Sequence, residues 1–167
     1  LQKLNVHSSY LHEDILEYAE KIADLHTASI ESVVFSCSGT EANEVAMTMA
    51  RIATGGSAFI CTNAAYHGNS DQVGKLTYVP LENNKRKNIY SIPYPQTFRP
   101  IVAGLSEEEL SLKYLQVLED TITQIKADGI GFAGILFCPI FANEGLPEIP
   151  AGFMQAATQM VRDAGGL

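Results

Sequence analysis

The chain contains 167 residues, of which 46% are hydrophobic and 18% are charged, and its formal net charge is −8. This length and composition are typical of one globular domain with a sizeable core, and they exclude an intrinsically disordered chain. The acidic balance argues against nucleic acid or an anionic membrane as the main partner, and no apolar stretch reaches the length of a bilayer span.

The first predicted element is an amphipathic helix from Tyr10 to about Leu25. Apolar residues recur there at three- and four-residue spacing, which places them on one face of a helix; they are Ile15, Leu16, Ala19, Ile22 and Ala23. His12 and His26 lie at the ends of this segment, and isolated histidines in such places are more often surface or cap residues than ligands.

An apolar, β-branched run over residues 32–37 predicts a first buried strand, and a helix from Thr40 to Ala53 is expected to follow it. The helical periodicity predicts a buried stripe that consists of Ala42, Val45, Ala46, Met49 and Ile52. Met47 and Met49 are therefore interpreted as core residues rather than as a metal site.

The turn Ser38-Gly39-Thr40 joins this strand to this helix. The first N–H groups of a helix have no intrahelical acceptor, and together with the positive end of the helix dipole they form an anion site. Gly39 allows the close backbone approach that a phosphate needs, and Thr40 can add a hydroxyl donor. A second reading remains open, in which Ser38 or Thr40 only caps the helix.

A second continuous apolar run, at residues 57–61, predicts a parallel strand that is covered on both faces. Strand, helix and strand at this spacing form a βαβ unit, whose ligands bind at the carboxyl edge of the sheet. The following loop, residues 62–68, should therefore bring Tyr66 close to the turn at Thr40. Tyr66 offers a flat ring that could stack on an aromatic ligand.

From about Ser106 onward, the sequence gives clear secondary-structure signals. Residues 69–104 give weaker signals: a short helix that reaches Lys75, a solvated loop tip at 83–88, and a proline-rich loop whose Arg99 is expected at the surface. Ser106 and Glu109 form a capping box, which predicts a helix to about Asp128. A strand at 130–140 and a helix at 152–163 should follow.

The cysteines and the chain ends add two expectations. Cys37, Cys61 and Cys138 all lie in apolar runs without a CxxC pair, which predicts buried, reduced thiols in a cytoplasmic protein. The chain begins with Leu1 and ends with the residues AGGL, a pattern typical of a helix stop and then the first residue of a new strand. We therefore expect a fragment.

Two motifs carry a family resemblance. Residues 38–44 (SGTEANE) resemble the phosphate-binding turn of class III pyridoxal-phosphate (PLP) aminotransferases, and residues 65–69 (AYHGN) follow in the family's order and at about its spacing. The resemblance implies an α/β fold of type I, with three layers and a mostly parallel sheet that has helices on both faces. Residues 1–167 would be a partial large, PLP-binding domain, with no second domain.

The same resemblance implies roles for particular residues. Ser38, Gly39 and Thr40 would hold the PLP phosphate, Tyr66 would stack on the pyridine ring, and His67 would help to shape the site. The family's acid at the pyridine nitrogen and its Schiff-base lysine would both come after Leu167. We therefore expect no catalytic residue and no metal ligand in this chain, which should not catalyse by itself.

Residues 138–142 (CPIFA) depart from the family, which usually has Glu-Pro-Val-Gln-Gly there. Cys138 replaces the carboxylate and Phe141 the amide, so the usual amino-acid substrate is in doubt. The resemblance implies an aminotransferase that acts on small-molecule amines and keto acids as a homodimer. Two alternatives remain: a phospho-lyase of the same family, favoured by residues 10–13 (YLHE) and 164–166 (AGG), and a degenerate, non-catalytic module.

Overall fold

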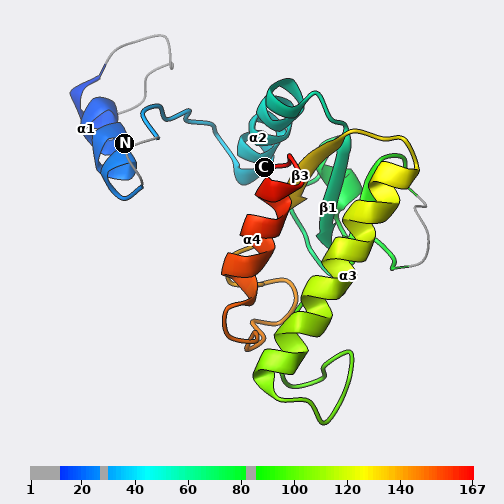
Figure 1. Cartoon of the computed structure of the whole chain (residues 1–167). Helices are drawn as coiled ribbons and strands as arrows, with labels where there is room; N and C mark the ends of the chain where they lie inside the picture. Colours follow the sequence, from blue (N-terminus) through cyan, green and yellow to red (C-terminus); the bar gives the residue numbers. More distant parts are fainter. Residues whose placement is uncertain (1–11, 27–29, 82–85) are drawn as a thin grey trace. The chain divides into compact units, whose positions relative to one another are not determined.

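The computed structural model describes residues 12–26, 30–81 and 86–167 (Figure 1). The chain divides into two compact units, Leu1–Ser38 and Gly39–Leu167, and each is described by itself. The first unit contains helix α1 (Glu13–Asp24), so the predicted amphipathic helix is confirmed. His12 caps it, because the His12 Nδ1 accepts a hydrogen bond from the Asp14 backbone N–H at 3.2 Å. His12 is therefore a cap residue, as expected.

The predicted strand at residues 32–37 is wrong. Residues 30–36 have no regular secondary structure, and the Val34 side chain is 64% exposed. Phe35 stacks on Tyr18 of α1, with ring centroids 5.5 Å apart. A β-branched run becomes a strand only when a neighbouring strand takes up its backbone hydrogen bonds, and none of the strands in the described residues pairs with it. Cys37 is consequently exposed, which corrects the expectation of a buried thiol.

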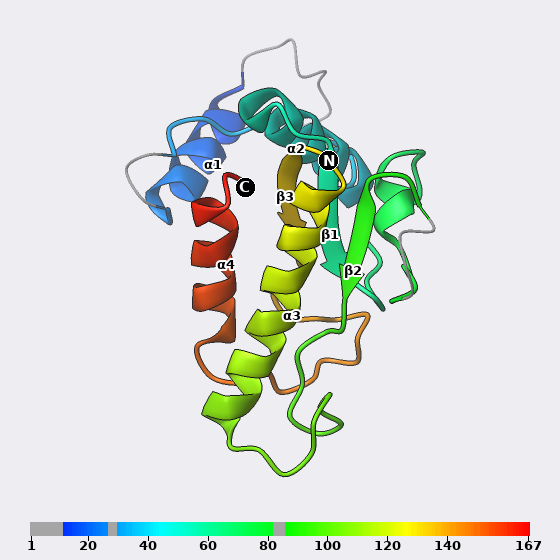
Figure 2. The same cartoon turned by 45° about the vertical axis from the view of Figure 1, so that its right-hand side comes forward.

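The second unit is built on a parallel sheet in the order β2-β1-β3 (Figure 2). The central strand β1 (Ala58–Thr62) is fully buried, and it is flanked by β2 (Ile89–Ile92) and β3 (Phe132–Leu136). Strand β1 confirms the predicted strand at 57–61 with a shift of one residue, and β3 confirms the predicted strand at 130–140 in shorter form. Strand β2 was not predicted, since its four residues follow a charged loop and precede a proline-rich one.

Helices cover both faces of this sheet, so the predicted three-layer α/β fold is confirmed. Ala58 and Ile60 pack against α3 (Glu107–Ala127) and α4 (Phe153–Asp163). Phe59 and Cys61, whose side chains alternate with these, pack against α2 (Gly39–Thr54) and the short 3₁₀ helix η1 (Val73–Leu76). Figure 2 shows α3 and α4 together on one side of the strands.

The predicted buried stripe of α2 is also wrong. Met47 and Ala50 face the sheet and are buried, whereas the predicted stripe is exposed in the described structure: Ala42, Val45, Ala46, Met49 and Ile52. Met47 is a core residue as expected, but Met49 is 57% exposed. The helix is apolar around much of its circumference, so its periodicity could not decide which face would meet the sheet.

The later elements follow the sequence closely. Ser106 and Glu109 form the predicted capping box of α3, and Gly129 follows the helix with φ 71°. The Leu167 backbone bonds to Ala133 O and Ile135 N at 3.1 and 2.9 Å, so Leu167 begins a pairing along the free edge of β3, as predicted. No helix within residues 12–26, 30–81 and 86–167 is long and apolar enough to cross a membrane.

Candidate functional site at the carboxyl edge of the sheet

The start of α2 and the loop after β1 are in direct contact. The Asn43 side chain, in the first turns of α2, donates a hydrogen bond to the His67 carbonyl at 2.7 Å. Gly68 packs so closely on Thr40 that a Cβ atom at Gly68 would lie 2.6 Å from the Thr40 Oγ1. The two sequence motifs therefore meet at the carboxyl end of β1, as expected, although the first strand of the predicted βαβ unit is absent from the described structure.

The helix start has the properties of an anion site. The first backbone N–H groups of α2 have no acceptor within the helix, and the helix dipole adds partial positive charge there. A Cβ atom built at Gly39 would meet no other atom within 4 Å, so space is open beside the turn. Gly39 and Thr40 belong to the same unit as Tyr66 and His67, whereas Ser38 belongs to the other unit.

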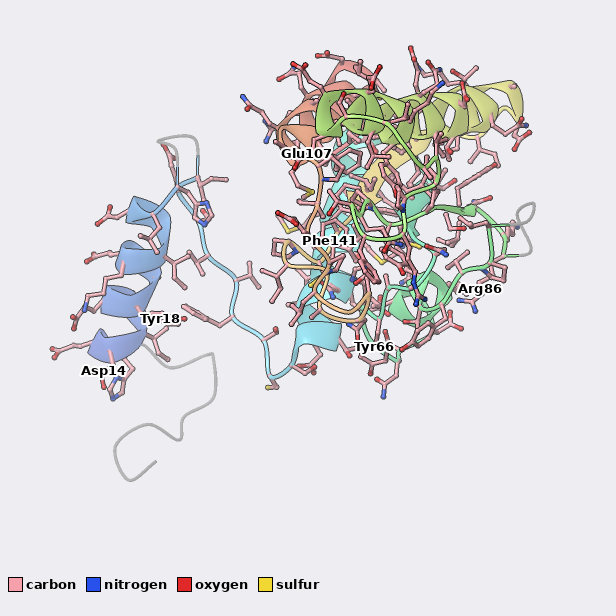
Figure 3. The ribbon with its side chains drawn as sticks, turned by 90° about the horizontal axis from the view of Figure 1, so that it is seen from below. Asp14, Tyr18, Tyr66, Arg86, Glu107 and Phe141 are labelled. Atoms are coloured by element: carbon pink, nitrogen blue, oxygen red, sulfur yellow. The ribbon has the colours of Figure 1, made fainter. Side chains whose placement is uncertain are left out.

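Tyr66 combines an exposed ring with a fixed backbone. The residue is 46% exposed, and Figure 3 shows it at the periphery of its unit. Its carbonyl accepts a hydrogen bond from the Asn143 side chain at 3.4 Å, and the Thr77 hydroxyl donates to the Gly68 carbonyl at 3.1 Å. A flat ring on an anchored loop can stack on an aromatic ligand without much loss of conformational entropy.

His67 is buried beside Tyr66 and is only 9% exposed. Burial lowers the pKa of His67 below its usual value, while the negative charge of Glu144 and a hydrogen bond with the Leu136 backbone partly oppose that effect. His67 is therefore neutral at pH 7. Its Nε2 atom is buried and has no hydrogen-bond partner.

The loop after β3 contributes an apolar cluster. Phe141, labelled in Figure 3, is buried. Its ring packs on Phe137, with ring centroids 5.8 Å apart. Its φ of 48° is unusual for a bulky residue and shows that the surrounding packing fixes this turn. Cys138 is only half-buried, and its sulfur accepts a hydrogen bond from the Ala142 N–H at 3.5 Å. The expectation of a buried thiol at Cys138 is thus met only in part.

Sequence reasoning missed two carboxylates near this edge. Glu144 is 9% exposed, and its Oε1 accepts a hydrogen bond from the Thr62 hydroxyl at the end of β1. Glu44 accepts hydrogen bonds from the Ser70 hydroxyl and from two backbone N–H groups, those of Gln72 and Val73. The Ser70 bond is the main reason that the pKa of Glu44 lies below its ordinary value. Both carboxylates act over long sequence separations, which no local pattern encodes.

The unit is thus an α/β domain whose ligand edge combines a helix N-terminus with an anchored aromatic loop, an arrangement suited to an aromatic phosphate ester. Comparison with known proteins agrees with this class. The profile of the family described as Aminotransferase class-III matches residues 2–167. The chain belongs to the class III aminotransferase family.

Two curated relatives are similar to most of this chain. Alanine–glyoxylate aminotransferase 2 homolog 2, mitochondrial, from Arabidopsis thaliana is 29% identical over 160 residues, which cover 95% of this chain and 32% of that protein. Human alanine–glyoxylate aminotransferase 2, mitochondrial, is 28% identical over 178 residues, with 95% and 34% covered. The chain therefore spans about a third of the length of the curated relatives it matches.

Solved structures give the same fold. A phospholyase from Arthrobacter in complex with phosphoethanolamine superimposes with a TM-score of 0.83 at 29% identity, covering 99% of this chain and 39% of that one. An omega-aminotransferase from Paracoccus denitrificans gives a TM-score of 0.79 at 22% identity, covering 96% and 37%, and this likeness shows the fold alone.

Proposed function

We propose that this chain is a PLP-binding part of an enzyme that transfers an amino group from an amine or amino acid to a keto acid. The observation that carries the proposal is the contact between the first turns of α2 and the Tyr66–Gly68 loop. That contact joins an anion site to an exposed aromatic ring, and PLP presents a phosphate and an aromatic ring to match them.

Each residue of the proposed site has a role that its geometry supports. The N–H groups at Gly39 and Thr40, with the Thr40 hydroxyl, would bind the phosphate. The role of Ser38 stays a prediction from the family resemblance, because Ser38 belongs to the other unit. Tyr66 would orient the pyridine ring, while buried His67 would exclude water from behind that loop. When bound, PLP supplies an electron sink for the substrate carbanion. The proposal assigns binding, and no catalytic step, to the residues of this chain.

A homodimer and a cytoplasmic location are further parts of the proposal. The family resemblance supports the dimer, and the cysteines in apolar runs support a reducing compartment. Two of the curated relatives carry "mitochondrial" in their names. Sedimentation of the complete gene product and imaging of its tagged form are the respective measurements.

The second candidate is a PLP-dependent phospho-lyase. It is favoured by the similarity to the Arthrobacter phospholyase, whereas Cys138 and Phe141, which stand where the resembling family usually has a carboxylate and an amide, favour the non-catalytic module. Incubation of the complete gene product with phosphoethanolamine distinguishes the two. Release of inorganic phosphate without a keto acid supports the lyase, whereas consumption of the keto acid with no phosphate release supports the aminotransferase.

A PLP titration tests the proposed site. Charge-assisted hydrogen bonds to a phosphate are worth about 1.5–3 kcal/mol each, and about 1.4 kcal/mol corresponds to a tenfold change in affinity. Gly39→Val should therefore weaken PLP binding at least tenfold by blocking the approach of the phosphate. Since a side chain at Gly39 meets no protein atom within 4 Å at its Cβ, the variant should still fold.

Ala42→Val, on the exposed side of the same helix, is the matched control and should leave PLP affinity unchanged. Equal affinity of the Gly39→Val variant and the unmodified protein would exclude the turn as the phosphate site. No PLP binding by the unmodified protein would instead favour the non-catalytic module.

A further inference from the structure

Two buried acceptor atoms near the proposed site have no hydrogen-bond partner. They are the Glu144 Oε2 and the His67 Nε2, and they are the only such side-chain atoms within the described parts of the chain. Both residues are 9% exposed. Buried polar atoms in folded proteins are almost always satisfied, so each of these two atoms is a place where a further hydrogen bond can form.

Glu144 and its neighbour touch the loop after β1 at two separate points. The Glu144 Oε1 accepts a hydrogen bond from the Thr62 hydroxyl, where β1 ends. The Asn143 side chain donates to the Tyr66 carbonyl at 3.4 Å. These contacts join segments about 80 residues apart in the sequence, and they hold the loop at its beginning and in its middle.

Glu144 also acts on His67 through its charge. Burial lowers the pKa of His67, and the negative charge of Glu144 raises it, so the two side chains interact electrostatically. Glu144 is thus connected to the loop after β1 at Thr62 by a hydrogen bond and at His67 by its charge.

We propose that Glu144 is a positioning residue, which fixes the loop after β1 by accepting a hydrogen bond from the Thr62 hydroxyl and by the action of its negative charge on His67. The ligand that the loop serves is PLP only if the proposed function holds. The positioning itself is a property of the protein without ligand, and its test therefore uses no PLP.

The test is backbone deuterium exchange of the complete gene product, read by mass spectrometry on peptides that cover residues 62–68. Glu144→Ala should exchange in this loop at least tenfold faster, because the hydrogen bond to Thr62 and the charge that acts on His67 are both lost. Glu144→Gln should restore exchange to within about threefold, because its amide oxygen still accepts a hydrogen bond from Thr62. Glu148→Ala, an exposed glutamate in the same segment, is the matched control and should change nothing.

Deuterium exchange at the imidazole C2 position gives the pKa of His67 in the same samples. That pKa should fall in both Glu144 variants, because the nearby negative charge is lost, and should stay constant in Glu148→Ala. A purely steric role for Glu144 would leave the pKa of His67 unchanged in the Glu144 variants. If Glu144→Ala does not fold, the experiment uses Thr62→Val instead. This variant should exchange faster in the loop, whereas the pKa of His67 should stay constant, because Glu144 keeps its charge.

Three outcomes would overturn the proposal: unchanged loop exchange in Glu144→Ala, no rescue by Glu144→Gln, or a His67 pKa that does not respond to Glu144. Failure of the proposed function has a different signature, since the unmodified protein would then bind no PLP while the loop and the pKa of His67 still depended on Glu144.

Discussion

The contact between Gly68 and Thr40 makes a sharp prediction about stability. Gly68 has φ 147°, and a Cβ atom there would lie 2.6 Å from the Thr40 Oγ1 and 2.9 Å from a methyl group of Val73. Gly68→Ala therefore introduces both backbone strain and a steric overlap. The overlap arises only if the loop after β1 lies on the first turn of α2, so the variant probes the geometry on which the candidate site depends.

The expected cost is the sum of two contributions. A side chain in an unfavourable backbone conformation costs about 1–3 kcal/mol, and overpacking costs about 1–3 kcal/mol more. Gly68→Ala should thus reduce the free energy of unfolding by about 2–6 kcal/mol. Gly104→Ala is the matched control, because Gly104 has φ 82° and a Cβ atom there would meet nothing within 4 Å. Gly104→Ala should reduce the free energy of unfolding only by the cost of the unfavourable backbone conformation.

Urea unfolding of the two variants gives both free energies. The difference between them should be about 1–3 kcal/mol, and removal of the Thr40 hydroxyl in a Gly68→Ala/Thr40→Ala double variant should recover about 1 kcal/mol of it. Equal destabilisation by Gly68→Ala and Gly104→Ala, with no recovery in the double variant, would refute the contact.

Three further predictions concern the rest of the chain. In urea unfolding, Met47→Ala should lower the free energy of unfolding by about 2–5 kcal/mol, because Met47 is buried against the sheet. Met49→Ala, on the exposed face of the same helix, should lower it by less than about 0.5 kcal/mol. Equal losses of stability would contradict the observed orientation of the helix. Burial raises the pKa of Cys61 to about 12, so a thiol reagent at pH 8 should label exposed Cys37 at once and Cys61 only after unfolding; rapid labelling of both would contradict the burial. The pKa of Glu44 is lowered in the folded state, so its contribution to stability is present above pH 4.5 and is lost as the pH falls through the folded pKa; thermal unfolding of Glu44→Gln should accordingly show a weaker pH dependence between pH 5 and about pH 3.

The sequence predicts elements whose signals are local. The capping box of α3, the continuous apolar run of β1 and the glycine after α3 all lie within a few residues of the structure they encode. The sequence also predicted that the Tyr66 loop meets the start of α2, but it did so from a βαβ unit whose first strand is not formed; the contact instead depends on the Asn43 bond to the His67 carbonyl and on the close packing of Gly68 on Thr40.

The errors have a common cause, which is tertiary context. The run at residues 32–37 has β-branched residues but no partner strand in the described structure, and β2 is a strand because β1 pairs with it. The face of α2 that packs on the sheet is the one that meets Phe59 and Cys61, and the apolar periodicity of the α2 sequence does not identify it. Glu144 acts on Thr62 across 82 positions, and a single sequence gives no signal for such a pair.

A crystal structure of the complete gene product with PLP tests the central claim most directly. We predict that the phosphate lies within hydrogen-bond distance of the backbone N–H groups at Gly39 and Thr40, about 2.7–3.2 Å, and that the Tyr66 ring stacks on the pyridine ring. A phosphate bound elsewhere, or a pyridine ring that does not contact Tyr66, would contradict the assignment of this edge as the cofactor site.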